Sequence, residues 1–291
     1  MFGSFSHRGA LLETEDGARS WHRVPLRGGG WIAGVAGGGG LAYAVTVGCS
    51  TDTVCHDVRL FRTRLGSLRW TRVPARGIGR DNEAGGVGLA AFGASVWLVI
   101  GNGTRPTLLR STDSARAFRA ITPLAAVACD PKATSSDVVW LSCSTGMMIA
   151  FLRSEGSASP RTLPVFGSGT GNSFTEPLSD DVAVAGTAIG QWAGVHETTT
   201  AGNKFVRTGG LPRQARTGRS VLITFLGRRV GFALVRGKEL LRTTDGGRTW
   251  RPVNLRRLAM PACRFASLDI TSGVGGGPSL RTEARSRCGP P

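Results

Sequence analysis

The stretch TTDGGRTW, residues 243–250, decides the fold of this chain because weaker copies of it recur upstream at regular intervals. Its pattern is Ser/Thr-x-Asp-x-Gly-x-Ser/Thr followed by an aromatic residue, and we call it the turn motif. The last positions of the copies fall at residues 21, 70, 118, 161, 205 and 250, so the steps are 43 to 49 residues. One compact hairpin signal per period of this length is typical of a β-propeller with four-stranded blades.

The upstream copies keep different parts of this pattern. The copies that end at residues 21 and 118 keep the aspartate, whereas those that end at 70 and 205 have lost it. The copy at 154–161 keeps little beyond Ser154 and its place in the period. The residues that we assign to the motif in its three best copies are Thr14, Asp16, Trp21, Ser111, Asp113, Thr243, Asp245, Gly247, Thr249 and Trp250.

Apolar runs rich in β-forming residues precede most of the motif copies by 11 to 20 residues. They lie at 41–45, 96–99, 138–141 and 230–234, and each carries one aromatic residue. Short apolar runs bounded by Gly, Pro and Ser are typical of strands. No stretch of ten or more residues shows a sustained helical period. The sequence therefore predicts an all-β chain.

The repeat predicts one β-propeller domain over residues 1–291, a length that all-β domains commonly reach as single units. Six blades fit the six motif copies, and seven blades are the alternative. The first residues enter the outer hairpin of a blade without earlier inner strands. We therefore expect residues 262–288 to pair beside residues 10–25, so that the N-terminal and C-terminal segments close one blade.

The turn motif closely resembles the Asp-box, or bacterial neuraminidase repeat, of sialidases, sortilin-like receptors and photosystem II assembly propellers. In that family the box lies on the hairpin between the third and fourth strands of a blade, away from the usual active site. The resemblance implies a structural turn, in which Asp245 bonds to nearby backbone N–H groups and Gly247 takes a positive φ. It also implies that Trp250 packs the turn onto its blade and that the motif is not catalytic.

The six cysteines fall into three local pairs, although six thiols allow fifteen connectivities. An even, paired set indicates an oxidising compartment. The first nine residues show no basic region followed by an apolar core, so no secretion signal is visible in this chain. We expect an exported protein, extracellular or at the cell surface. The predicted disulfides are Cys49–Cys55, Cys129–Cys143 and Cys263–Cys288.

The formal net charge is +17, and arginine carries nearly all of it because the chain has three lysines. One interpretation is a surface for a polyanion. The other, which we favour, is the base composition of a GC-rich genome, since the arginines are scattered and no basic run with interleaved aromatics occurs. Nucleic-acid binding is therefore not favoured. No window of about 18 apolar residues predicts a membrane span.

Ligands of propellers approach the face that carries the connections between blades and the second-to-third strand loops. On this face we predict a site for a glycan or a protein, formed by carboxylates and an arginine. No cofactor is expected, and no metal site either, since the cysteines and histidines lack metal-ligand spacing. The predicted ligand-binding residues are Arg80, Asp81, Glu83, Asp130, Glu176 and Asp180.

Sialidases use a Tyr nucleophile paired with Glu, an Asp acid/base and an arginine trio, as the resemblance implies. Tyr43 is the single tyrosine of this chain, and its alignment with Trp97, Trp140 and Phe232 makes it a blade-core aromatic. The hypothesis is therefore a non-catalytic binding or scaffold propeller, with an anionic glycan or a protein as ligand. The alternatives are a sialidase-like glycoside hydrolase and an assembly-factor-type propeller that holds a partner through a basic patch.

Overall fold

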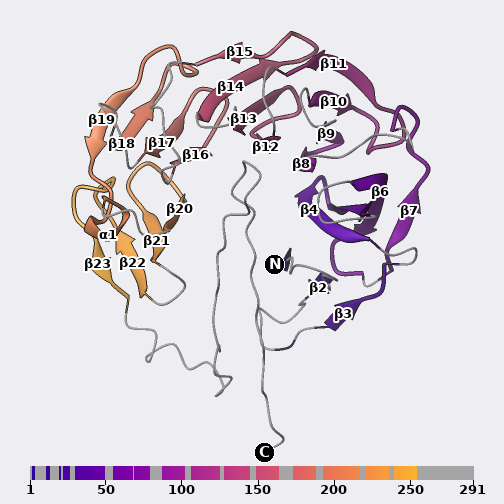
Figure 1. The fold of residues 1–291 in the computed structure, drawn as a ribbon, viewed down its shortest axis with the longest axis horizontal. Coiled ribbons are helices and arrows are strands. Elements are labelled where there is room, and N and C mark those ends of the chain that lie inside the picture. The colour runs from indigo at the N-terminus through magenta and orange to yellow at the C-terminus, as the bar shows by residue number, and fades with distance from the viewer. Residues whose placement is uncertain are drawn as a thin grey trace, which may run out of the picture. The chain divides into compact units, whose positions relative to one another are not determined.

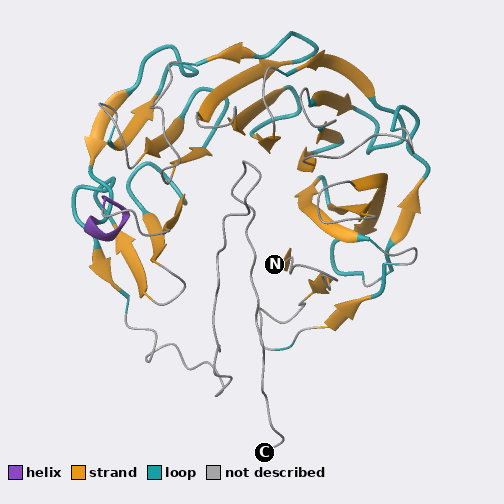
Figure 2. Ribbon diagram, in the orientation of Figure 1, coloured by secondary structure: helices purple, strands orange, loops and turns teal. Residues whose placement is uncertain are grey.

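The computed structural model divides into two compact units. The first comprises Met1–Gly146 and Phe151–Thr162, and the second comprises Met147–Ala150 and Leu163–Pro291. Both consist almost entirely of strands and turns (Figure 1, Figure 2). The residues that the structure describes are 2–3, 11–13, 20, 22–26, 30–49, 55–67, 69–78, 87–101, 106–124, 128–144, 149–163, 173–187, 193–216, 221–235 and 239–253.

The first unit holds a three-stranded sheet followed by three four-stranded sheets. In each sheet, every strand pairs antiparallel with the next strand in sequence. The strands are β1 (Phe2–Gly3), β2 (Leu11–Glu13), β3 (His22–Val24), β4 (Trp31–Gly38), β5 (Leu41–Cys49), β6 (Cys55–Arg64), β7 (Thr71–Val73), β8 (Val87–Phe92), β9 (Ser95–Ile100), β10 (Thr107–Ser111), β11 (Arg119–Pro123), β12 (Ala128–Ala133), β13 (Val138–Ser144), β14 (Ile149–Glu155) and β15 (Arg161–Thr162).

The second unit holds two four-stranded sheets of the same meander topology. A four-residue helix, α1 (Arg213–Arg216), lies in the connection between them and is a small departure from the predicted all-β chain. The strands are β16 (Ser173–Pro177), β17 (Ala183–Thr187), β18 (Gly194–Thr198), β19 (Val206–Gly209), β20 (Val221–Phe225), β21 (Gly231–Val235), β22 (Glu239–Thr243) and β23 (Arg251–Pro252).

A meander places its first and third connections at one edge of the sheet and its second connection at the other. The turn motifs occupy the third connection, so they lie beside the hairpin that joins the first two strands. In all five four-stranded sheets a motif N–H donates to a carbonyl of that hairpin, at 2.7 to 2.9 Å. We call this side of the sheets the motif edge. The five bonds run from Leu65 to Gly40, Ser114 to Ala94, Gly156 to Asp137, Ala201 to Asp181 and Gly246 to Arg229.

The second strands carry the largest buried side chains, as their apolar sequence predicts. Tyr43, Trp97 and Trp140 are at most 1 % exposed and lie in β5, β9 and β13. Two of these rings carry an arginine from the third strand of the same sheet. The guanidinium of Arg110 lies 4.8 Å from the centre of the Trp97 ring, and that of Arg153 lies 5.6 Å from Trp140. In such cation–π contacts the charged guanidinium lies over the ring, and the apolar stem of the arginine covers the aromatic core.

The first strands of consecutive sheets contact each other, β4 with β8 and β8 with β12 in the first unit, and β16 with β20 in the second. The approach between β8 and β12 is close. A Cβ atom on Gly88 would collide with Pro131 and lie 2.5 Å from the carbonyl oxygen of Cys129. Pro131 is tolerated in β12 because a first strand has an edge without a ladder partner. The first strands therefore form the inner layer of each unit.

The disulfide between Cys129 and Cys143 is confirmed, and it joins directly opposed residues of β12 and β13. The backbones of Cys49 and Cys55 also face each other in register between β5 and β6. Their disulfide stays a prediction, and Cys263 and Cys288 lie outside the described residues.

The predicted all-β architecture is confirmed, with five four-stranded antiparallel sheets. One detail differs at the N-terminus, because β1 pairs with β2 and so precedes the outer hairpin. The closing segment 262–288 lies outside the described residues, and the single domain over 1–291 stays a prediction. No described helix has the length and apolar character that a membrane crossing requires.

Candidate functional site

The full turn motif joins β22 to β23 and is held by two side chains. The Thr243 hydroxyl donates to Oδ1 of Asp245 at 2.8 Å and accepts from the Gly247 N–H at 2.9 Å. Asp245 in turn accepts from the Thr249 N–H at 2.9 Å and from the Thr249 hydroxyl at 2.6 Å. Gly246 and Gly247 have φ values of 73° and 84°, where glycine carries no steric cost. The role predicted for each of these residues matches this geometry.

The copy that joins β10 to β11 repeats this network. The Ser111 hydroxyl donates to Asp113 at 2.6 Å and accepts from the Ala115 N–H at 3.0 Å. Asp113 accepts from two further backbone N–H groups, at 2.9 and 3.1 Å. Ser114 and Ala115 take φ values of 60° and 71° although neither is glycine. The hydrogen-bond network therefore outweighs the cost of two left-handed residues.

Copies without aspartate still hold the turn through the first hydroxyl. Thr198 accepts from the Gly202 N–H at 3.0 Å, as its counterparts do in the better copies. Thr63 and Ser154 instead donate to the carbonyl four residues later, both at 2.7 Å. The weak copy at 154–161 is thus a third connection, as its phase predicts. Thr14, Asp16 and Trp21 of the first copy lie outside the described residues.

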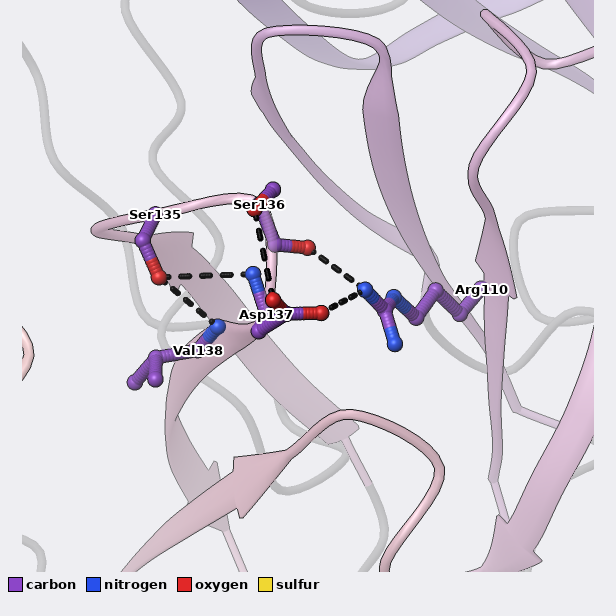
Figure 3. Close-up of polar contacts among 5 residues, drawn as sticks. All are labelled: Arg110, Ser135, Ser136, Asp137 and Val138. Atoms are coloured by element: carbon purple, nitrogen blue, oxygen red, sulfur yellow. Dashed lines mark hydrogen bonds and ion pairs between the residues drawn. The ribbon is translucent and has the colours of Figure 1, made fainter.

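The residue directly before a turn motif reaches the neighbouring sheet. Arg62 donates to the carbonyl of Ser114 at 3.0 Å. Arg110 bonds the Ser136 carbonyl at 2.8 Å and pairs with Asp137, in the first hairpin of the next sheet (Figure 3). The Ser135 hydroxyl accepts from the N–H groups of Asp137 and Val138, and these bonds shape that hairpin (Figure 3).

Glutamate takes the same position in two other sheets. Glu13 accepts from the Trp70 indole N–H at 3.3 Å, and Glu197 pairs with Arg228 at 2.5 Å. These contacts between sheets were not predicted from the sequence. A charged residue lies directly before each motif copy. Alignment of the repeats in the sequence is enough to recognise this position.

Trp250 packs the last motif onto the preceding sheet as well as onto its own. Its ring meets Phe225 edge-on at 6.1 Å, and its indole N–H donates to the Gly210 carbonyl at 2.9 Å. The Gly210 N–H donates to the Gly247 carbonyl, also at 2.9 Å. The motif is therefore a joint between two sheets, which extends the predicted packing onto one blade.

The predicted ligand-binding residues are not brought together within the described part of the chain. Arg80, Asp81 and Glu83 lie outside it, as do most connections opposite the motif edge. Asp130 is exposed in β12, a strand and not the predicted connection between blades.

Glu176 and Asp180 correct the prediction in the second unit. Glu176 lies in β16 and accepts from the Thr224 hydroxyl of β20 at 3.1 Å. Asp180 lies in the hairpin between β16 and β17, at the motif edge, and not in a connection between blades. Pro131 and Pro177 lie in β12 and β16, because a first strand has an edge without a ladder partner and therefore accepts proline.

Tyr43 cannot serve as a nucleophile where it lies. It is fully buried in β5, the strand between β4 and β6, and it packs in a cluster with Leu98 and Phe118 of the next sheet. Burial raises the pKa of its hydroxyl above the ordinary value of 10.0. The phenol is therefore neutral at physiological pH and has no solvent-exposed face. No group of three or more His, Cys, Asp or Glu suited to a metal occurs among the described residues.

The second unit carries two hollows that meet at the last turn motif. The larger, of about 740 Å³, is lined by Glu197, Thr208, Arg228, Arg229, Thr244, Asp245, Gly246 and Arg248. The smaller, of about 530 Å³, shares Arg248 and is lined by the apolar side chains of Leu211, Pro212, Leu241, Trp250 and Pro252, with Arg213 and Glu239 among the others. These hollows were not predicted from the sequence, because their walls come from two different sheets.

The turn motif makes the stability of the fold depend on pH. Bonds from Thr249 hold the pKa of Asp245 at about 2, below its ordinary 3.8, and the Ser111 hydroxyl lowers that of Asp113. A carboxyl with a lowered folded-state pKa stabilises the fold above about pH 4, and this contribution is lost as the pH falls toward 2. We expect Asp245→Asn to cost about 1 kcal/mol at pH 6 and much less at pH 2. Thermal unfolding of both proteins between pH 2 and 6 measures this, and a constant gap would contradict it.

No protein-family model and no curated protein matches this chain. Solved structures match it in fold. A structure of YCF48 bound to D1 peptide has a TM-score of 0.58 and 14 % identity, over 85 % of this chain and 76 % of that one. YCF48 from Cyanidioschyzon merolae has a TM-score of 0.54 and 15 % identity, over 86 % and 83 %. The GH74 enzyme of Niastella koreensis has a TM-score of 0.51 and 16 % identity, over 79 % of this chain and 38 % of its own. The chain thus has an all-β fold of propeller type, built from four-stranded antiparallel blades.

Proposed function

We propose that this chain is an exported, non-catalytic propeller that binds a segment of a protein partner. The proposed site is the one predicted from the sequence, with Arg80, Asp81 and Glu83 among its residues. The observation that carries the proposal is the likeness in fold to YCF48 bound to D1 peptide, over 85 % of this chain. The Cys129–Cys143 disulfide supports export, since such bonds persist in oxidising compartments.

The burial of Tyr43 supports a binding role over the sialidase-like alternative. We expect Tyr43→Phe to leave ligand binding unchanged. A fluorogenic sialoside assay tests the alternative directly, because turnover that is abolished by Tyr43→Phe would replace binding with catalysis as the function.

A displayed library of random peptides tests peptide binding. Peptides enriched on the wild-type protein are synthesised, and their dissociation constants are measured by fluorescence anisotropy. We expect Arg80→Ala, Asp81→Ala and Glu83→Ala together to weaken binding at least tenfold. Asp180→Ala is the control, because Asp180 lies at the motif edge. A triple variant that binds as the wild type does, or a library without enrichment, would refute the proposal.

The salt dependence of the affinity for the selected peptide distinguishes a specific peptide site from a basic patch. A basic patch attracts its partner through charge, and the attraction between exposed charges weakens as salt shortens the Debye length to about 3 Å at 1 M. Affinity that survives 1 M salt supports a specific peptide site. Affinity that disappears supports the assembly-factor-type basic patch.

A further inference from the structure

The larger hollow of the second unit is a groove at the motif edge. Its walls are the first hairpin of one sheet, around residues 226–229, and the last turn motif, with β18 and β19 of the preceding sheet opposite. A volume of about 740 Å³ falls within the range of small-molecule sites, roughly 300 to 1,000 Å³.

Arginine dominates the chemistry of this groove. Arg228 is paired through its Nε with Glu197, whose side chain is 10 % exposed, while the Arg228 side chain is 61 % exposed. Arg229 and Arg248 are also exposed. The Arg248 Nε donates to the Thr208 carbonyl at 3.4 Å, which orients its guanidinium. Within the described residues Arg229 and Arg248 have no carboxylate partner, so two guanidinium forks are open to a ligand.

The acidic residue in the groove wall is already engaged. Both carboxylate oxygens of Asp245 accept bonds inside the turn, from Thr243 and from Thr249. Neither oxygen therefore competes strongly for the arginines. The hydroxyls of Thr208 and Thr244 add uncharged polar groups to the walls.

The fold alone does not require these cations. In the sheet that carries Asp113, the corresponding hairpin between first and second strands has Gly93 and Ala94, and its carbonyl accepts the same motif bond. Arg116 takes the place of Arg248 in that copy, but no pair of arginines faces it from the hairpin. The paired arginines at 228 and 229 are therefore a local feature of one joint.

We propose that this groove binds a small sugar that carries a sulfate or phosphate ester. Arginine forks match tetrahedral oxyanions in geometry and bind them through paired, charge-assisted hydrogen bonds. The open forks of Arg229 and Arg248 take the ester oxygens, with Arg228 adding charge beside them. The Thr208 hydroxyl, which donates to the carbonyls of Val195 and Gly246, accepts from one hydroxyl of the sugar, and the exposed Thr244 hydroxyl bonds another. The adjoining hollow, which shares Arg248 and contains Trp250, receives the less polar face of the ring.

Isothermal titration with a sulfated disaccharide derived from heparin tests the proposal. We expect Arg229→Gln and Arg248→Gln each to weaken binding at least fivefold. Arg116→Gln is the matched control, because it removes one charge from the equivalent position of the motif copy that contains Asp113. This control matters because a chain of net charge +17 attracts any polyanion. The thermal unfolding midpoint of each variant verifies that it is folded.

Three arms distinguish the outcomes. The unsulfated disaccharide should not bind, whereas inorganic sulfate and inorganic phosphate should bind more weakly than the disaccharide and lose affinity in the same two variants. Equal losses in all three arginine variants would show diffuse attraction and refute the groove. Folded variants at 229 and 248 that bind as tightly as the wild type would refute it as well. The peptide-binding triple variant should keep the sugar affinity, so this site and the proposed function fail separately.

Discussion

Replacing Gly209 with alanine is expected to destabilise the protein by about 3 kcal/mol, because it separates the last turn motif from the preceding sheet. A Cβ atom at this position would lie 2.6 Å from the carbonyl oxygens of both Gly246 and Gly247. Backbone atoms of a turn that is already fixed by Asp245 cannot move aside cheaply. The displacement would also break the bond between Gly210 and Gly247 and that between Trp250 and Gly210.

Gly210→Ala is the control for this prediction, because it changes the neighbouring residue in the same segment. No atom lies within 4 Å of a Cβ built on Gly210, and its φ is not in the left-handed region. We expect no loss, or a gain of about 0.5 kcal/mol from a less flexible unfolded chain. Urea unfolding followed by tryptophan fluorescence measures both variants. Equal stability of the two would show that the joint does not depend on this close approach.

Trp97→Ala is expected to cost about 3 to 5 kcal/mol, the usual range for removing a large buried aromatic side chain. Trp97 is fully buried in β9 and packs in a cluster with Val99, Leu108 and Leu141. Its loss leaves a cavity that the strands on either side cannot close. It also removes the ring beneath the Arg110 guanidinium, which then borders the cavity.

Phe92→Ala removes an aromatic ring from the adjacent strand, where 46 % of the residue is exposed. We expect it to cost less than about 1 kcal/mol, since little apolar surface returns to water. Circular dichroism during guanidinium unfolding gives the free energy of both variants. A Trp97→Ala protein as stable as the Phe92→Ala protein would mean that the second strands do not form the core.

Local sequence signals predicted the sheets and the turns well. The aromatic runs at 41–45, 96–99 and 138–141 became second strands, because burial on both faces favours continuous apolar residues. The turn motif predicted its turn correctly because Thr243, Asp245 and Thr249 form hydrogen bonds with one another within seven residues of sequence. Its network needs no partner elsewhere in the chain.

The candidate sites were predicted less well, because they depend on pairing and on contacts between sheets. Asp180 lies in the hairpin between β16 and β17 and not on the predicted face, because the pairing of strands decides at which edge a connection lies. The arginine groove was missed because Arg248 is far in sequence from the adjacent pair Arg228 and Arg229, and cations that are distant in sequence form no local pattern. In a sequence of net charge +17, many other combinations of arginines are equally plausible as an anion site.

The sequence by itself determined the period, the strands within each period and the turn that closes each outer hairpin. These features follow from bonds and packing over a few residues. The tertiary structure decided which groups meet between neighbouring sheets, such as Arg110 with Asp137, 27 residues apart, and Trp250 with Gly210, 40 residues apart. Such contacts depend on how one sheet packs against the next, because the two partners come from neighbouring sheets.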